Sequence, residues 1–210
     1  MKYLIKELNQ RTDVFICSQN YDIMSNMPIV LFRQSKQQEL ETILWTIKEH
    51  RLVEKFCNVI IYPKLPRHLW QAIEQDDKTF KNSRGIVKLH LEKTNQLVLQ
   101  KNASKIVAPL WRKIEKEFFA RAVKLTKVKI CDKYICYLTR YGGGGSFNPP
   151  NTIWVRANIK NKNDLRFFTY TVAHEITHLL LDNLLNKKKR TKRQKEKAVD
   201  AVLIKTNLFK

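Results

Sequence analysis

Two histidines and a glutamate in the last quarter of the sequence have the spacing of a metal-dependent hydrolase site. His174, Glu175 and His178 form the pattern HExxH. If residues 174 and 178 lie on one helix, they share a face one turn apart, so both imidazoles can bind the same ion. Glu175 then lies beside the metal, where it can accept a proton from bound water. Tetrahedral zinc with one open position suits such a site. The alternative is a pair of histidines packed in a core or exposed on a helix.

A zinc site of this kind needs a third protein ligand. Asp182 lies on the same expected helix, but about 12 Å along the axis from the first histidine, which is too far for one ion. His68 and His90 lie far upstream and have no motif around them. Glu196 and Asp200 are better placed, because they lie four residues apart on the next expected helix and so share a face. The alternative for Glu196 is a solvated charge in a Lys-rich helix.

HExxH followed on the next helix by ExxxD resembles the gluzincin metallopeptidases, the broad group that contains thermolysin. The similarity is greatest to the small intracellular members related to immunity-region and stress-response metallopeptidases. The resemblance implies that zinc is held by His174, His178 and Glu196. It also implies that Glu175 is the general base and that Asp200 accepts a hydrogen bond from a zinc-binding histidine.

The resemblance covers roughly residues 107–210 and also suggests how a substrate binds. The segment 152–159 resembles the zincin edge strand, which pairs with an extended peptide. The basic run that connects the two motifs departs from the family pattern. No Tyr or His stands out as a group that stabilises an oxyanion, which leaves the catalytic site incomplete.

Strand-like and helical segments alternate along the chain. The N-terminal half predicts an apolar stretch at 14–17, a helix at 36–56, a strand at 58–62, a short helix at 69–75 and a hairpin of 86–91 with 96–100. The C-terminal half predicts a helix from 107, with its start blurred by Pro109, strands at 128–141 and 152–159, a helix at 164–185 and a last helix from about 192 towards 208. Together they predict an α+β fold: a minimal zincin-like domain at 106–210 with a small mixed sheet, an active-site helix and a ligand helix, preceded by a mixed α/β region at 1–105 of unknown role.

The chain is strongly basic, with 40 Lys and Arg against 19 Asp and Glu and a formal charge of +21. Such a charge favours nucleic acid, an anionic membrane or an acidic partner. The densest run makes nucleic acid a candidate partner through Lys187, Lys188, Lys189, Arg190, Lys192 and Arg193. The alternative is a solvated turn between two helices. Four of the five glycines form another unusual run, Gly142–Gly145, which is either a rim or lid of the cleft or a plain connector.

Neither secretion nor membrane insertion is indicated. No run approaches the ~18 apolar residues of a membrane span, and charges interrupt the N-terminus before a signal-peptide core can build. We therefore expect a cytoplasmic protein. The four cysteines, Cys17, Cys57, Cys131 and Cys136, form no CxxC pair and are expected to be buried free thiols.

The predicted function is zinc-dependent hydrolysis of peptide bonds, with a metal-activated water as nucleophile and Glu175 as general base. Protein or peptide is then the substrate, and Zn²⁺ the cofactor. Two alternatives stay open. One is a zincin-like nucleic-acid-binding or regulatory protein with little or no hydrolysis, and the other is a zinc hydrolase of a non-protein amide.

Overall fold

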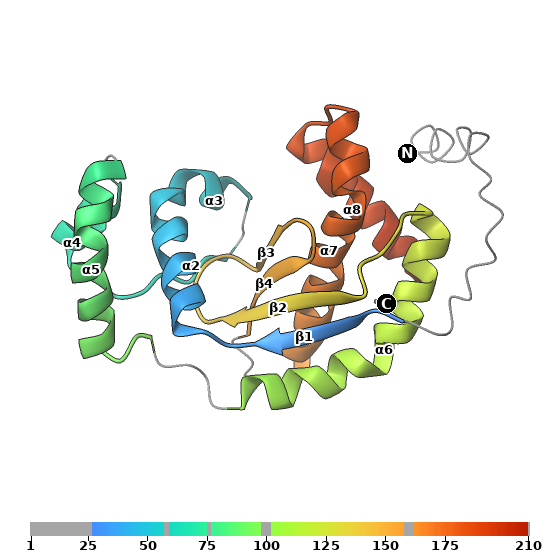
Figure 1. The fold of residues 1–210 in the computed structure, drawn as a ribbon, viewed down its shortest axis with the longest axis horizontal. Helices are drawn as coiled ribbons and strands as arrows, with labels where there is room; N and C mark the ends of the chain where they lie inside the picture. The colour runs from blue at the N-terminus through green and yellow to red at the C-terminus, as the bar shows by residue number, and fades with distance from the viewer. Residues whose placement is uncertain (1–26, 57–58, 75–76, 98–101, 158–161, 210) are drawn as a thin grey trace.

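The fold is taken from a computed structural model that describes residues 27–56, 59–74, 77–97, 102–157 and 162–209. Within these ranges the chain forms seven helices and one four-stranded sheet, which confirms the α+β class (Figure 1). The elements are β1 (Ile29–Arg33), α2 (Lys36–Lys48), α3 (His50–Phe56), α4 (Arg67–Glu74), α5 (Asp77–Lys93), α6 (Ala103–Thr126), β2 (Lys133–Thr139), β3 (Gly145–Asn148), β4 (Thr152–Arg156), α7 (Lys162–Lys187) and α8 (Lys192–Thr206). None of the described helices has the length and apolar character that a membrane span requires.

The sheet is mixed, with the strand order β1-β2-β4-β3. β1, β2 and β4 are parallel, whereas β3 runs antiparallel to β4 and pairs with no second strand of this sheet. The segment expected to be the edge strand, 152–159, is therefore an internal strand where it is described. The edge strands are β1 and β3, and neither was predicted; β3 lies in the glycine-rich link.

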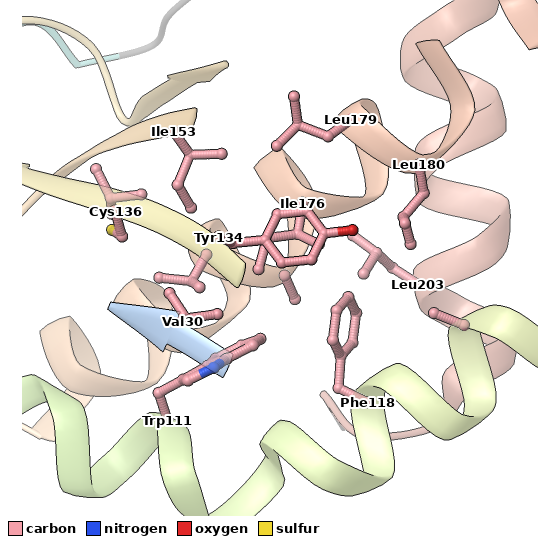
Figure 2. Close-up of a cluster of buried hydrophobic side chains, with 14 of the residues drawn as sticks. Val30, Trp111, Phe118, Tyr134, Cys136, Ile153, Ile176, Leu179, Leu180 and Leu203 are labelled. Atoms are coloured by element: carbon pink, nitrogen blue, oxygen red, sulfur yellow. The ribbon is translucent and has the colours of Figure 1, made fainter. Parts of the chain in front are cut away.

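The main core lies between one face of the sheet and the helices α6, α7 and α8. Alternate residues of β2, namely Tyr134, Cys136 and Leu138, are buried there, as the two-residue period of a strand requires. Trp111 and Phe118 of α6 approach the sheet from below in Figure 2. This packing places α7, which carries the HExxH motif, directly against the sheet.

A second apolar cluster joins α2, α4 and α5 at the other end of the molecule. Leu40, Ile43 and Ile47 of α2 are almost fully buried, and they pack with Ile73 of α4 and Val87 of α5. Their spacing along α2 is that of one helix face. The cluster gives this helical region a core separate from the one that supports α7.

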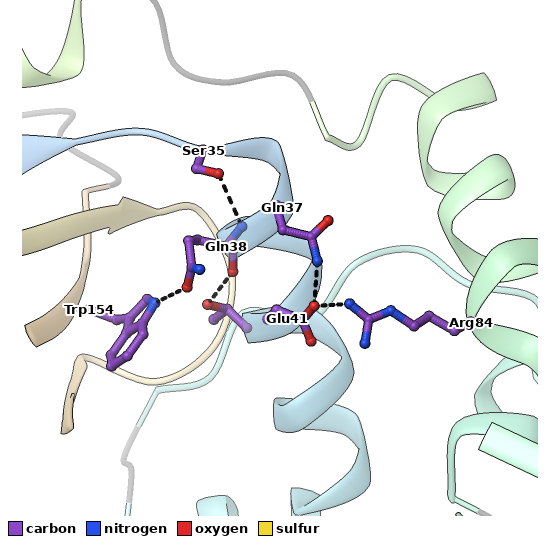
Figure 3. Close-up of polar contacts among 7 residues, drawn as sticks. Ser35, Gln37, Gln38, Glu41, Arg84 and Trp154 are labelled. Atoms are coloured by element: carbon purple, nitrogen blue, oxygen red, sulfur yellow. Dashed lines mark hydrogen bonds and ion pairs between the residues drawn. The ribbon is translucent and has the colours of Figure 1, made fainter. Parts of the chain in front are cut away.

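Polar contacts fix the start of α2 (Figure 3). The Ser35 hydroxyl accepts a hydrogen bond from the Gln38 backbone N–H and so caps the helix. The Gln38 side chain accepts a bond of 3.0 Å from the Trp154 indole N–H, which ties α2 to β4. Farther along, Glu41 forms an ion pair with Arg84 of α5. The Gln38 bond thus joins the helical region to the sheet, and the Glu41 ion pair joins two helices within that region.

The structure corrects several N-terminal predictions. The helix expected at 36–56 is divided at Glu49 into α2 and α3. The hairpin is wrong, because residues 86–91 belong to helix α5. At 59–62 there is no strand but a single bridge between Ile61 and Gly142. The apolar stretch at 14–17 and residues 98–100 lie outside the described part of the chain.

The C-terminal helices agree more closely with the sequence. The helices α7 and α8 begin and end within about one turn of the predicted limits, and α6 extends over Pro109. The predicted strand at 128–141 shortens to β2. Cys136 is a buried free thiol, whereas Cys131 is only half-buried, and Cys17 and Cys57 lie in ranges that the structure does not describe. The division at 105/106 stays a prediction, although β1 pairs with β2 across it.

Candidate metal centre

Helix α7 presents the two histidines of HExxH to one side and an apolar stripe to the core. Phe168, Val172 and Ile176 are buried against the sheet and α6. His174 and His178 lie one turn apart on another face, with imidazole ring centroids 4.8 Å from each other. The helix is thus held by its apolar face, and its histidines are positioned by the same packing.

Helix α8 brings the third candidate ligand back to α7. Its first turn is fixed by a complete capping box between Thr191 and Gln194, which also ends the turn between the two helices. Farther along α8, Val199 and Leu203 are buried in the core. Glu196 lies on the α7 side of α8, so the capping and packing of α8 determine the position of the Glu196 carboxylate.

Three ligand atoms converge in this site. The Nε2 atoms of His174 and His178 are 3.1 Å apart. The Glu196 Oε2 atom lies 3.3 Å from each of them. Elsewhere in the described ranges, no three His, Cys, Asp or Glu side chains meet in this way.

The triangle can be compared with the ligand spacing that zinc requires. Zinc binds imidazole nitrogen and carboxylate oxygen at about 2.0–2.2 Å in tetrahedral geometry, which separates two ligand atoms by about 3.3–3.6 Å. The observed sides of 3.1, 3.3 and 3.3 Å come within a few tenths of an ångström of these values. The donors are two imidazoles and one carboxylate, a set that zinc accepts in open sites. The residues therefore fit a zinc ion with a free fourth position.

The charges of the group agree with this fit. Hydrogen bonds from the two imidazoles hold the pKa of Glu196 well below its usual range, so this carboxylate is ionised. Burial lowers the pKa of His174, but the bond to Glu196 and the surrounding carboxylates outweigh it and the net shift is upward. A cation in the triangle would thus replace a proton shared among the same three side chains.

Glu175 is buried beside the group and is not one of its three converging side chains. Burial raises the pKa of Glu175 to about 7, although the neighbouring His174 opposes the shift. A carboxyl group with a pKa near neutrality is suited to accept and return a proton at physiological pH. This is the property that the general-base role requires.

The edge strand β3 covers the site from the sheet side. The Phe147 ring stacks on the His178 imidazole, with centroids 4.7 Å apart and planes inclined by 7°. At Gly145 the backbone passes so close to α7 that a Cβ atom would lie 2.6 Å from Glu175 Oε1. Phe147 was not predicted as part of the site, whereas Gly145 belongs to the run interpreted from the sequence as either a rim or lid of the cleft or a plain connector. The glycine run was the only signal in the sequence that the chain passes close to another element here.

The glycine loop that leads into β3 is anchored at several points. The buried carboxylate of Glu39 on α2 accepts hydrogen bonds from the backbone N–H groups of Arg140 and Tyr141. Gly142 exchanges two backbone bonds with Ile61. Arg156 donates its backbone N–H to the Gly144 carbonyl and its guanidinium to the Gly142 carbonyl. These bonds fix the path by which β3 reaches Glu175.

Behind His174 lie Asp200 and Tyr170. The Asp200 Oδ1 atom is 3.8 Å from His174 Nδ1, and it accepts a hydrogen bond of 3.4 Å from the Tyr170 hydroxyl. Burial, together with the charge of Asp200, raises the pKa of Tyr170, so its hydroxyl remains a proton donor. Tyr170 was not identified from the sequence.

The structure thus brings His174, His178 and Glu196 together, with Glu175 and Asp200 beside them. The chain matches no protein-family model, no curated protein and no solved structure. Asp182 lies one turn beyond His178 and does not join the group. His68 on α4 and His90 on α5 do not join it either.

Proposed function

We propose that the protein is a zinc-dependent metallopeptidase. The observation that carries the proposal is the triangle of His174 Nε2, His178 Nε2 and Glu196 Oε2, whose sides match those of a tetrahedral zinc site. In this proposal the three side chains hold the ion. A bound zinc ion supplies Lewis-acid activation of a water molecule and of the carbonyl group that it attacks.

Glu175 has the role of proton acceptor. It follows His174 directly, it is buried, and its raised pKa suits proton transfer near neutral pH. It takes the proton from the attacking water and returns it to the leaving amine. The surrounding protein excludes solvent from Glu175, which is 6% exposed.

The position of β3 supports a peptide as substrate. β3 ends the sheet beside the candidate metal centre, and its Phe147 and Gly145 contact the HExxH helix. An extended peptide can add to such an edge through main-chain hydrogen bonds. In the proposal it is therefore β3, and not 152–159, that aligns the scissile bond with Glu175.

The test compares wild type with Glu175→Gln on casein and on a mixed peptide library. We expect wild-type hydrolysis to be abolished by a chelator and restored by zinc. Glu175→Gln should keep its zinc and lose about 10²–10⁴-fold in turnover, because an amide cannot accept the proton. Glu92→Gln, at an exposed position on α5, is the matched control and should behave as wild type. Turnover of Glu175→Gln within a few-fold of wild type would refute the role of Glu175.

A second candidate function, nucleic-acid binding, is supported by the exposure of the basic run. Its Lys187, Lys188, Lys189, Lys192 and Arg193 side chains are all exposed at the turn between α7 and α8. If they bind phosphates, affinity for duplex DNA should fall with salt by a log–log slope of about −0.9 for each phosphate contact. Replacing the three consecutive lysines with glutamine should flatten that slope, and an unchanged slope would exclude this run. Zinc binding without hydrolysis of any peptide would favour this function or the cleavage of a non-protein amide.

A further inference from the structure

His174 has one ring nitrogen that the ligand triangle does not use. Its Nδ1 atom is buried without a hydrogen-bond partner, the one such side-chain atom in the described residues. When Nε2 binds an ion, the neutral ring carries its proton on Nδ1, and this N–H needs an acceptor. Asp200 Oδ1 lies 3.8 Å from it, a few tenths of an ångström beyond hydrogen-bond distance.

Asp200 alone is poorly held for this task. Its side chain is 50% exposed, so the carboxylate can turn towards water instead of the imidazole. The contact that keeps Oδ1 on the His174 side is the 3.4 Å hydrogen bond donated by Tyr170. Tyr170 lies one turn before His174 on α7, so its hydroxyl reaches across to α8 from the same face of the helix.

The Tyr170 ring is itself held by two ring contacts. Phe209, just beyond the end of α8, packs edge-on against it with ring centroids 5.6 Å apart. Its ring centroid also lies 5.9 Å from that of the His174 imidazole. The hydroxyl therefore projects from a rigid support, which a hydrogen bond across two helices requires if it is to orient the carboxylate.

We propose that Tyr170 is a positioning residue for the metal centre: it holds the Asp200 carboxylate beside His174 Nδ1 and thereby orients the imidazole. Tyr170 acts through Asp200, and Asp200 acts through His174. The inference rests on the proposed zinc site and adds to it a residue outside the HExxH and ExxxD motifs. Carboxylates behind a metal-binding histidine fix the ring and raise its basicity, so an anchor for that carboxylate has a measurable effect on metal affinity.

The test is a double-mutant cycle of zinc affinity by chelator competition, on wild type, Tyr170→Phe, Asp200→Asn and the double variant. Tyr170→Phe removes one oxygen and keeps the ring that packs on Phe209. We expect Asp200→Asn to weaken zinc binding about 10–100-fold. Tyr170→Phe should weaken it by less, about two- to tenfold, and should add nothing when Asp200 is already changed.

A second readout is the visible absorption of the cobalt-substituted protein, which reports ligand orientation. Tyr170→Phe should shift the cobalt bands in the direction of Asp200→Asn. The control, Tyr137→Phe, changes a tyrosine of β2 that stacks on Trp154, and it should leave affinity and spectrum unchanged. Two results would overturn this inference alone, provided that the wild type binds zinc. One is a Tyr170→Phe variant with the affinity and spectrum of the wild type. The other is an effect of Tyr170→Phe that persists in the Asp200→Asn background. Wild type that binds no zinc would overturn the proposed function and this inference with it.

Discussion

Gly145 is the position where a single methyl group tests the contact between β3 and the HExxH helix. In Gly145→Ala the new Cβ would lie 2.6 Å from Glu175 Oε1 and 2.8 Å from both Glu175 Cγ and Thr171 Cγ2. Ordinary contact begins near 3.4 Å. To reach that distance, the oxygen must move by 0.8 Å (3.4 − 2.6) and each of the two carbons by 0.6 Å (3.4 − 2.8). Glu175 is 6% exposed and Thr171 is also 6% exposed, so neither side chain has free space to move into.

Forcing such a displacement in a packed site costs about 1–3 kcal/mol. The alanine also restricts the unfolded chain, which returns at most about 1 kcal/mol. We therefore expect a net loss of about 1–2 kcal/mol, which lowers the melting temperature by about 2–8 °C in a chain of this size. Thermal unfolding followed by circular dichroism, with chelator present so that no metal contributes, measures this change.

Gly85→Ala is the matched control for the same substitution. Gly85 lies on the exposed side of α5, and a Cβ added there meets nothing within 4 Å. Because alanine favours a helix over glycine by about 0.5–1 kcal/mol, this variant should melt about 1–4 °C above wild type. If Gly145→Ala instead matches or exceeds wild type in stability, the close approach of β3 to Glu175 is refuted.

Two further predictions concern carboxylates. In chelator competition, Glu196→Ala should lose zinc almost completely, whereas Asp200→Ala should only weaken zinc binding. Asp182→Ala should leave it unchanged. A greater loss of zinc affinity in Asp200→Ala than in Glu196→Ala would contradict the ligand assignment. Burial raises the pKa of Glu39 from 4.5 to about 7, so the folded state binds this proton more tightly than the unfolded state and stability falls as pH rises between these values. Glu39→Gln removes this pH dependence of stability, so the melting temperature of the variant minus that of the wild type should increase from pH 5 to pH 8. A difference in melting temperature that stays constant over this range would contradict burial as the origin of the raised pKa of Glu39.

The candidate site could be predicted largely because helix geometry is local. The i, i+4 spacing of His174 and His178 determines their common face, and the Thr191 capping box determines where the next helix begins. Once α8 starts there and buries Val199, Glu196 faces α7. The first two steps depend on residues close in sequence. The direction of Glu196 depends also on the packing of Val199 in the core, and its choice as third ligand came from the resemblance to the gluzincins.

The missed features depend on contacts between distant segments. Residues 86–91 suggest a strand because apolar residues at 87, 89 and 91 alternate with Lys88 and His90. In the helix only Val87 and Leu91, one turn apart, are buried, whereas Leu89 is exposed. The identity of the edge strand follows from the pairing of β3 with β4, and the short sequence Gly145–Asn148 has little strand propensity of its own. Tyr170 joins the site only through a hydrogen bond to another helix.

The most direct test of the metal centre is the zinc content of the purified protein. Protein produced in zinc-replete medium and desalted should contain about one zinc per chain by elemental analysis, since three ligand atoms are already placed within 3.3 Å of one another. His178→Ala, which removes a ligand from a buried position, should contain almost none. Wild-type protein without zinc, or His178→Ala with the wild-type content, would contradict the assignment of His174, His178 and Glu196 as a zinc site.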